Sequence, residues 1–416
     1  MRDPALERFT TSFGPEFGHG KPFDLAHLRA ALAALGAPQM KLPPVIHVAG
    51  TNGKGSTIAF MRAIAEAANL RAHAFTKPHL FKLNERFLVA GEIVSDDTLI
   101  AAAERVHAVA PALTQFDAQI AAASVLFSET PADVVLLETG MGGREDSTNV
   151  IAPAVSVITP IGLDHQDALG ATLAQIAAHK AGIIKAGAPV VLARQTDTAR
   201  EVLEAHAARV GAPLLRQGVE WDAYLSAGNL VVQTETRALD LPSPTLHGAH
   251  QVDNAGLACV ALMTWRALSD SAFGVGVAWA DWPARLQPLT RGALSAPIRS
   301  LGGEVWVDGG HNEDAAKALA RAMREMHRVR GGTVIAIVGL RARKDAAAFV
   351  AALSHGAHKI IAVPLSEPHA PLDLISPLQA PSLAAAMQSA AQFPAPRVLI
   401  CGSLLLAAEA LAAESA

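Results

Sequence analysis

The chain has 416 residues, of which 51% are apolar and 17% are charged. This composition is typical of a folded protein with a large core and excludes global disorder, and the length suits two domains better than one. Lysine and arginine number 34 against 38 aspartates and glutamates, so the formal net charge is −4. Nucleic-acid and membrane-surface proteins usually carry a basic excess, and this balance therefore argues against both classes.

Only two cysteines are present, Cys259 and Cys401, which excludes a disulfide framework and favours a reducing compartment. The first residues contain no apolar run of the kind that a secretory signal needs. The stretch from Val398 to Ala413 is the most apolar, but it contains Glu409 and suits a strand followed by a core-facing helix better than a membrane span. The sequence thus predicts a soluble cytoplasmic protein.

Short apolar runs alternate with alanine-rich helical stretches along most of the chain. Continuous apolar strands separated by helices are typical of a parallel sheet that is buried on both faces. The first strands predicted in this way are Val45–Val48, Ala72–Phe75, Asp133–Leu137, Ala154–Thr159 and Val190–Ala193. The predicted helices are 55–68, a helix from an N-cap at Ser95 to near Pro111, 114–129, 172–186 and 198–210.

Residues 213–246 differ, because two strand-like runs flank a Ser-Ala-Gly-Asn turn and predict a β-hairpin inserted beside the main sheet. After a proline-interrupted region, strands are predicted at Val305–Asp308, Thr333–Gly339, Lys359–Val363 and Arg397–Cys401. We therefore predict an α/β fold with two doubly wound domains. The first, residues 1–292, is a P-loop ATPase-like domain with a mostly parallel sheet, and the second, residues 293–416, is smaller and Rossmann-like.

The strongest chemical signal is the run Gly50-Thr51-Asn52-Gly53-Lys54-Gly55-Ser56-Thr57, which follows a short strand and opens a helix. Such a turn places backbone N–H groups and a helix N-terminus around a phosphate. Lys54 is expected to reach the β- and γ-phosphates of ATP. The run is not a strict Walker A loop, so the hydroxyl that binds Mg²⁺ must come from Ser56 or Thr57. A plain packing turn is the alternative, although most of these residues are poor choices for packing.

A second signal is an acidic residue at the end of a strand. Glu138 ends a buried strand, where an unpaired carboxylate is costly, so a metal ion or a cation must satisfy it. A Walker B-type acid binds Mg²⁺ from such a position. A salt bridge between Glu138 and Arg144 is the alternative. His165 also follows a strand, in the region of the phosphate loop, which favours a metal ligand over a structural histidine.

These motifs resemble the bacterial folylpolyglutamate synthase and dihydrofolate synthase family of the Mur-ligase superfamily. The resemblance runs from about residue 5 to residue 410, and the motifs keep the family's order along the chain. Besides the phosphate loop, they are Phe75-Thr76-Lys77-Pro78-His79-Leu80 with Asn84-Glu85-Arg86, Glu138 to Val150, Ile161 to His165, Lys180-Ala181-Gly182-Ile183, His250 to Asn254, Pro283-Ala284-Arg285 and Asp308 to Asn312.

The resemblance implies an ATP-dependent ligase that uses two Mg²⁺ ions and forms an acyl phosphate. In the family, residues matching Glu138 and His165 bind metal, and the lysine matching Lys180 is carbamoylated by CO₂ and becomes anionic. The predicted metal ligands are Ser56, Glu138, His165 and carbamoylated Lys180, and the predicted catalytic residues are Lys54, Glu138, His165 and Lys180. The predicted ATP contacts are Gly50, Thr51, Asn52, Gly53, Lys54, Gly55, Ser56, Thr57, Asn254, Arg285, Asp308 and His311. The predicted folate and pterin contacts are Pro78, His79, Phe116, Arg144 and Asp146.

The family's activity gives the expected function. The chain should join L-glutamate to dihydropteroate and also extend the glutamate chain of folates, with closure of the two domains excluding water. We expect a monomer that binds these small molecules and neither nucleic acid nor membrane. Two alternatives are a Mur-type ligase acting on another carboxylic acid and a non-catalytic paralogue that binds a nucleotide or a folate.

Several positions depart from the family pattern. Lys77 stands where the family has a serine that helps to hold the second metal ion, and an ammonium group cannot ligate Mg²⁺. Lys77 therefore either points away from that metal or partly replaces its charge. Glu145 replaces a usual leucine beside Asp146, so the pterin side of the site is expected to differ. Asp117 and Gly310 replace a glutamate and an alanine.

The substitution Lys77→Ser tests the first departure. It should raise the affinity for Mg²⁺, because it removes a repelling charge and restores a hydroxyl ligand. The measurement is the Mg²⁺ dependence of turnover in the two proteins. An unchanged metal dependence would contradict the idea.

Overall fold

The computed structural model describes residues 3–16 and 24–415. Two compact units divide the chain: the first runs through Thr245 and includes Val252–Asp281, and the second holds Leu246–Gln251 and the chain from Trp282 onward. The α/β class is as predicted. The predicted boundary at residue 292 lies inside the second unit, because β12 (Gln287–Leu289) pairs with β13 of that unit.

An eight-stranded sheet forms the centre of the first unit, in the order β4-β3-β2-β5-β1-β6-β7-β8. The strands from β2 to β8 in this order run parallel, whereas β3 and β4 pair antiparallel at one edge. The central strands are buried along their whole length, because helices cover both of their faces. The strands are β1 (Val45–Ala49), β2 (Ala72–Phe75), β3 (Phe87–Val89), β4 (Glu92–Ile93), β5 (Val134–Glu138), β6 (Val155–Ile158), β7 (Val190–Leu192) and β8 (Leu214–Arg216).

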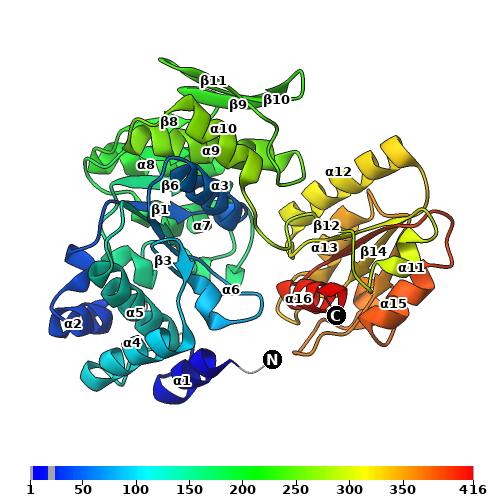
Figure 1. Cartoon of the computed structure of the whole chain (residues 1–416), viewed down its shortest axis with the longest axis horizontal. Helices are drawn as coiled ribbons and strands as arrows, with labels where there is room; N and C mark the ends of the chain where they lie inside the picture. Colours follow the sequence, from blue (N-terminus) through cyan, green and yellow to red (C-terminus); the bar gives the residue numbers. More distant parts are fainter. Residues whose placement is uncertain (1–2, 17–23, 416) are drawn as a thin grey trace. The chain divides into compact units, whose positions relative to one another are not determined.

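Helices of the first unit pack against this sheet and against one another. Residues of α1, α2, α4 and α5 form one apolar cluster with β1, β2 and β5. Helices α3 and α10 lie side by side (Figure 1). The helices are α1 (Pro4–Ser12), α2 (Ala26–Ala34), α3 (Lys54–Ala67), α4 (Asp96–Val109), α5 (Gln115–Glu129), α6 (Gln166–Leu169), α7 (Leu173–Lys180), α8 (Asp197–Val210), α9 (His250–Trp265) and α10 (Asp270–Trp279), with 3₁₀ turns η1 (Pro38–Met40), η2 (Leu83–Arg86), η3 (Ser147–Val150) and η4 (Ala181–Ile183).

The predicted hairpin forms, but it is part of a separate sheet. Strands β9 (Trp221–Ser226) and β10 (Asn229–Thr234) pair antiparallel, and β11 (Ala238–Leu241) adds a third strand to β10. This three-stranded sheet has its own strand order and is not continuous with the eight-stranded sheet. The predicted hairpin and small β insertion are therefore confirmed, and only the third strand was not predicted. β11 is only four residues long, too short for its alternation to stand out in the sequence.

One predicted helix ends early. The helix predicted over 172–186 stops as α7 at Lys180 and continues as the 3₁₀ turn η4. A Cβ atom on Gly182 would lie 2.3 Å from Cα of Arg144, so the chain passes the Arg144 loop at very short range. This close approach fixes the end of α7, and with it the position of Lys180.

A five-stranded sheet forms the second unit, in the order β12-β13-β16-β14-β15, with only β12 antiparallel. Its buried core includes Leu319, Met323 and Phe349. Among the described residues of the whole chain, no helix combines the length and the apolar composition that crossing a bilayer requires. The elements are β13 (Glu304–Val307), β14 (Val334–Val338), β15 (Lys359–Ala362), β16 (Arg397–Cys401), α11 (Ala296–Arg299), α12 (Glu313–Arg330), α13 (Ala346–Leu353), α14 (Leu372–Ile375), α15 (Leu383–Ala390) and α16 (Leu404–Ser415).

The contact between α3 and α10 can be tested with two glycines of one helix. A Cβ atom at Gly276 would lie 2.4 Å from Cα of Ile64, whereas a Cβ atom at Gly274 would meet nothing nearer than 3.6 Å. Gly276→Ala should lower the free energy of unfolding of the first unit by about 2 kcal/mol, because backbone must move to admit the methyl group. Gly274→Ala, the matched control, should be neutral or stabilising by up to about 1 kcal/mol. Urea unfolding measures both, and equal effects would contradict the packing argument.

Candidate active site

The phosphate loop joins β1 to α3 and is fixed by two glycines with positive φ. Gly50 has φ 146° and Gly53 has φ 92°, conformations that favour glycine. A Cβ atom at Gly50 would lie 1.8 Å from Oγ1 of Thr159, at the end of β6. The N–H of Thr51 also donates to the carbonyl oxygen of Pro160 at 3.0 Å. The loop is therefore held against the end of the neighbouring strand.

Lys54 begins α3 and turns back over this loop. Its Nζ donates to the carbonyl oxygens of Gly50 and Thr51, both at 3.2 Å, and lies 3.9 Å from Oε1 of Glu138. Behind it, the hydroxyl groups of Ser56 and Thr57 are buried in α3. The Oγ1 atom of Thr57 has no hydrogen-bond partner among the described residues. A hydroxyl group that could bind a ligand therefore lies just after Lys54 in the helix.

Glu138 ends β5 and is 3% exposed. The parallel register pairs it with Val48 of β1, which places its carboxylate beside the phosphate loop. Its Oε2 atom accepts a hydrogen bond of 3.0 Å from the backbone N–H of Lys77. The cation that we expected beside this carboxylate is therefore Lys54. The guanidinium of Arg144, the alternative partner, pairs with Glu145.

Lys180 comes from the far end of α7 to the same loop. Its Nζ donates to the carbonyl oxygen of Gly50 at 2.7 Å, so Gly50 accepts from two lysines. Burial, together with the ammonium of Lys54, lowers the pKa of Lys180 to about 7. The side chain is buried, so Lys180 is not an ordinary surface lysine.

His165 lies after β6, at the start of α6. It has φ 52°, in the left-handed region, and its backbone N–H donates to Oδ1 of Asp164 at 2.9 Å. In the part of the chain that the structure describes, no three histidine, cysteine, aspartate or glutamate side chains cluster as a metal site. A metal in this region would therefore draw on mixed donors, of which the Glu138 carboxylate and the Ser56 hydroxyl offer the oxygen atoms that Mg²⁺ prefers.

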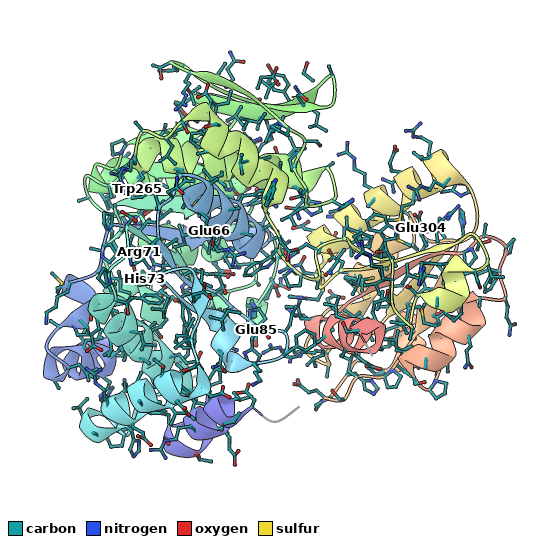
Figure 2. All side chains as sticks on the ribbon, in the orientation of Figure 1. Glu66, Arg71, His73, Glu85, Trp265 and Glu304 are labelled. Carbon is teal, nitrogen blue, oxygen red and sulfur yellow. The ribbon has the colours of Figure 1, made fainter. Side chains whose placement is uncertain are left out.

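The predicted folate loop follows β2 and is held by one carboxylate. Glu85 accepts from the backbone N–H groups of Leu80 at 2.7 Å, Phe81 at 3.0 Å and Lys82 at 2.9 Å. Figure 2 labels Glu85 on this turn. Three such bonds fix the path of the chain after Pro78, so the Asn-Glu-Arg motif has a clear structural reason for its glutamate.

Arg86 and His79 interact within the same loop. Arg86 donates through Nε to Nδ1 of His79 at 3.0 Å and through Nη1 to Oε1 of Gln119 at 2.9 Å. Burial, followed by the charge of Arg86, lowers the pKa of His79 to about 4. His79 is therefore neutral at pH 7 and acts here as an acceptor.

Asp146 organises the loop after Glu138. Its carboxylate accepts from the N–H of Met141 at 2.6 Å, and from the N–H and the hydroxyl of Thr148 at 3.0 and 2.5 Å. Because the Thr148 hydroxyl donates to Asp146, it accepts from Nε2 of His47, 2.8 Å away. Burial lowers the pKa of His47 to about 3 and raises the pKa of Asp146. The predicted pterin contact thus also has a structural role.

Phe116 lies in the apolar core and is 2% exposed. A Cβ atom on Gly140 would lie 2.3 Å from its ring, and Nζ of Lys77 lies 4.8 Å from the ring centroid. The predicted contact of Phe116 with a pterin ring would require Lys77 or the loop at Gly140 to move. Burial lowers the pKa of Lys77 to about 8.

Arg144, another predicted folate contact, is joined to the turn that carries Lys180. Its Nε donates to Glu145, and Glu145 in turn lies 2.8 Å from Nδ1 of His179. The N–H of Arg144 donates to the carbonyl oxygen of His179 at 2.7 Å. The glutamate that replaces the family leucine therefore links the Arg144 loop to the end of α7.

The remaining predicted nucleotide contacts fall in both units. Asn254 of α9 lies against Gly53, where a Cβ atom would be 2.5 Å from its Oδ1. In the second unit, Asp308 accepts from the N–H groups of Leu286 at 2.8 Å and Gly310 at 2.7 Å, and it therefore shapes the turn after β13. The other two are Arg285, which donates to the carbonyl oxygen of Ala284 at 2.9 Å, and His311, whose Nδ1 lies 3.0 Å from the carbonyl oxygen of Gly309.

Two family models match the chain: the Mur ligase middle domain over residues 48–262, and the Mur ligase, glutamate ligase domain over residues 297–412. The chain therefore belongs to the Mur ligase family. It is 36% identical over 321 residues to the dihydrofolate synthase/folylpolyglutamate synthase of Bacillus subtilis, covering 72% of each chain. It is 32% identical over 357 residues to the Escherichia coli protein of that name, covering 84% of this chain and 80% of the relative. Within Mur ligases, it is a member of the folylpolyglutamate synthase/dihydrofolate synthase family.

Solved structures of this family superpose on the whole chain. FolC of E. coli in complex with DHPP and ADP has a TM-score of 0.88 at 28% identity, covering 99% of this chain and 98% of that chain. The bifunctional protein of Yersinia pestis, complexed with AMPPNP and Mn ion, also has a TM-score of 0.88, at 29% identity and 100% coverage of both. A third, with Mn, AMPPNP and L-glutamate bound, has a TM-score of 0.84 at 30% identity and covers 95% of each chain.

The hydroxyl of Thr148 can be tested by an isosteric substitution. Thr148→Val removes the buried hydroxyl that accepts from His47 and donates to Asp146, while Asp146 keeps its two backbone N–H donors. Loss of these two buried hydrogen bonds should lower the free energy of unfolding by about 2 kcal/mol. Thr139→Val is the matched control, because the Thr139 hydroxyl is buried without a partner among the described residues, and it should change stability by less than about 0.5 kcal/mol. Urea unfolding of both variants is the measurement, and a neutral Thr148→Val would refute the network.

Proposed function

We propose that this chain is an ATP-dependent ligase that joins L-glutamate to dihydropteroate, and also to folates, through an acyl-phosphate intermediate. The relatives carry both names, and the related structures hold ADP or AMPPNP, Mn and L-glutamate. One observation supports the proposal most directly: Lys54 and Lys180 donate to the same carbonyl oxygen of Gly50, while Lys54 lies 3.9 Å from Glu138. The groups that we propose to bind phosphate and metal thus lie at one loop.

The first chemical step is transfer of the γ-phosphoryl group of ATP to the carboxylate of the acid. Backbone N–H groups of the loop and the ammonium of Lys54 bind the phosphates and offset the charge that develops on the transferred group. Lys54 exchanges its two carbonyl partners for phosphate oxygens. The N–H of Lys77 and the burial around it hold Glu138 in place during this exchange.

Mg²⁺ fits the donors present, since Ser56 and Glu138 supply oxygen atoms next to the predicted phosphate site. When bound, it would neutralise charge between the β- and γ-phosphates. His165 and Lys180 are the proposed ligands of a second ion, with Lys180 as its carbamate. Because Lys180 is buried beside Gly50, an anionic carbamate there would need such a cation as its counter-charge.

The second step is attack of the L-glutamate amine on the acyl phosphate, with release of phosphate. Asn254, Arg285, Asp308 and His311 are the proposed further nucleotide contacts, and Pro78, His79, Arg144 and Asp146 the proposed folate-side residues. Exclusion of water protects the acyl phosphate from hydrolysis. Phe116 is proposed only to line the folate side of the site, because its ring is buried.

We further propose that the protein binds only small-molecule substrates, is a monomer and acts in the cytoplasm. A Mur-type ligase acting on another carboxylic acid is the alternative enzyme, and a non-catalytic nucleotide- or folate-binding protein is the alternative binder. The pairing of Lys54 with Glu138 favours the enzyme over the binder, because both groups serve phosphoryl transfer.

The proposal is tested with the purified protein, ATP, Mg²⁺, L-glutamate and either dihydropteroate or tetrahydrofolate, with products read by mass. Lys54→Ala should lower turnover at least about a hundredfold, because it removes the charge that stabilises the transferred phosphoryl group. Lys317→Ala, a surface lysine with 58% of its side chain exposed, is the control and should be unchanged.

Each outcome separates two possibilities. Glutamate adducts of both acids indicate a bifunctional enzyme, and an adduct of dihydropteroate alone indicates a dedicated dihydrofolate synthase. ATP binding without any adduct would contradict the proposed reaction and favour another acid or a binding role. Substantial ADP formation by Lys54→Ala would contradict the role given to Lys54.

A further inference from the structure

A cluster of charged side chains on the folate loop has no part in the steps above. It consists of Lys77, Arg86 and Glu16. Nζ of Lys77 lies 3.8 Å from Oε1 of Glu16, and Nη2 of Arg86 lies 3.7 Å from the same oxygen. One carboxylate oxygen is therefore shared by two cations.

The members of this cluster differ in burial. The side chains of Lys77 and Arg86 are 14% and 6% exposed, whereas that of Glu16 is 47% exposed. Both pairs are also longer than the roughly 2.7–2.9 Å of a charge-assisted hydrogen bond. A half-exposed carboxylate at such distances can be displaced by an incoming carboxylate that approaches the buried cations more closely.

Lys77 connects the two halves of the site. Its backbone N–H donates to Glu138, the proposed metal ligand, at 3.0 Å. Its ammonium lies 4.8 Å from the centroid of Phe116, whose ring abuts Gly140. A Cβ atom on Gly140 would in turn lie 3.1 Å from Oδ2 of Asp146, the proposed pterin contact. A carboxylate that is attached to a pterin and receives a phosphoryl group must lie between these two halves.

We propose that the ammonium of Lys77 binds the reacting carboxylate of the acid substrate, and that Glu16 takes the place of this carboxylate in its absence. This inference rests on the proposed function, since it names the group that holds the acid of that reaction. A fixed cation at this point lowers the repulsion between the carboxylate and the phosphates of ATP. The family pattern has a serine at the position of Lys77, so this arrangement is a feature of this chain and not of that pattern.

Equilibrium binding tests the inference without turnover. Pteroic acid and its uncharged carboxamide are titrated calorimetrically into the full chain with AMPPNP and Mg²⁺. Lys77→Met should weaken binding of the acid about tenfold to a hundredfold, as expected for loss of a charged hydrogen bond, and leave the carboxamide within about twofold. Glu16→Gln should act in the opposite direction and tighten binding of the acid, because it removes the competing carboxylate.

Two further variants control for charge and for folding. Lys82→Met removes another lysine of the same loop, whose ammonium lies 3.6 Å from Asp96, and should leave the affinity for the acid unchanged. Lys77→Arg keeps the charge and should retain most of the preference for the acid over the carboxamide. If Lys77→Met does not fold, Glu16→Gln and Lys77→Arg still decide the question.

Several results would overturn the inference. They are an unchanged affinity for the acid in Lys77→Met, equal weakening of the acid and the carboxamide, or weaker binding of the acid in Glu16→Gln. Absence of binding of both compounds to the unaltered chain would overturn the inference together with the folate part of the proposed function. Charge-selective binding through Lys77 without any ligation of glutamate would overturn only the proposed reaction.

Discussion

The carbonyl oxygen of Gly50 is the point on which the arrangement of the candidate active site depends. It accepts hydrogen bonds from Lys54 at 3.2 Å and from Lys180 at 2.7 Å, although these lysines are 126 positions apart in the sequence. Two ammonium groups repel each other at such range, and this repulsion, added to burial, lowers the pKa of Lys180 to about 7. The carboxylates of Asp164 and Asp146 partly offset this effect at Lys180, and the carboxylate of Glu138 lies 3.9 Å from the ammonium of Lys54.

Close backbone packing, more than side-chain chemistry, brings Lys54 and Lys180 to the same carbonyl oxygen. Gly50 approaches Thr159 so closely that no side chain fits, and Gly182 passes Arg144 at similarly short range. The first contact fixes the loop after β1, and the second fixes the end of α7. Because β1 lies between β5 and β6 in the sheet, Glu138 and the segment leading to His165 emerge on either side of the phosphate loop.

The central strands and the phosphate-loop chemistry could be predicted from the sequence, because both depend on local patterns. Buried parallel strands are continuous apolar runs, and a glycine-rich turn that leads from a strand into a helix is typical of phosphate binding. The missed strands β3, β4, β8, β11 and β12 have two to four residues each, too few for a periodic signal. The network of His47, Thr148 and Asp146 was missed because its members are joined only in the folded chain: a histidine in an apolar strand carries no sign of a partner 101 positions away.

Charged residues on the folate side show why a motif alone does not assign a role. Glu85 and Asp146 both match family motifs, yet each accepts at least three hydrogen bonds within its own loop, which is sufficient reason for a carboxylate there. Lys77 differs, because its ammonium lies 3.8 Å from a half-exposed carboxylate, at a distance longer than that of a charge-assisted hydrogen bond. A bound carboxylate could approach this ammonium more closely than Glu16 does, and the proposed role of Lys77 as a carboxylate-binding group rests on its position between Glu138 and Phe116.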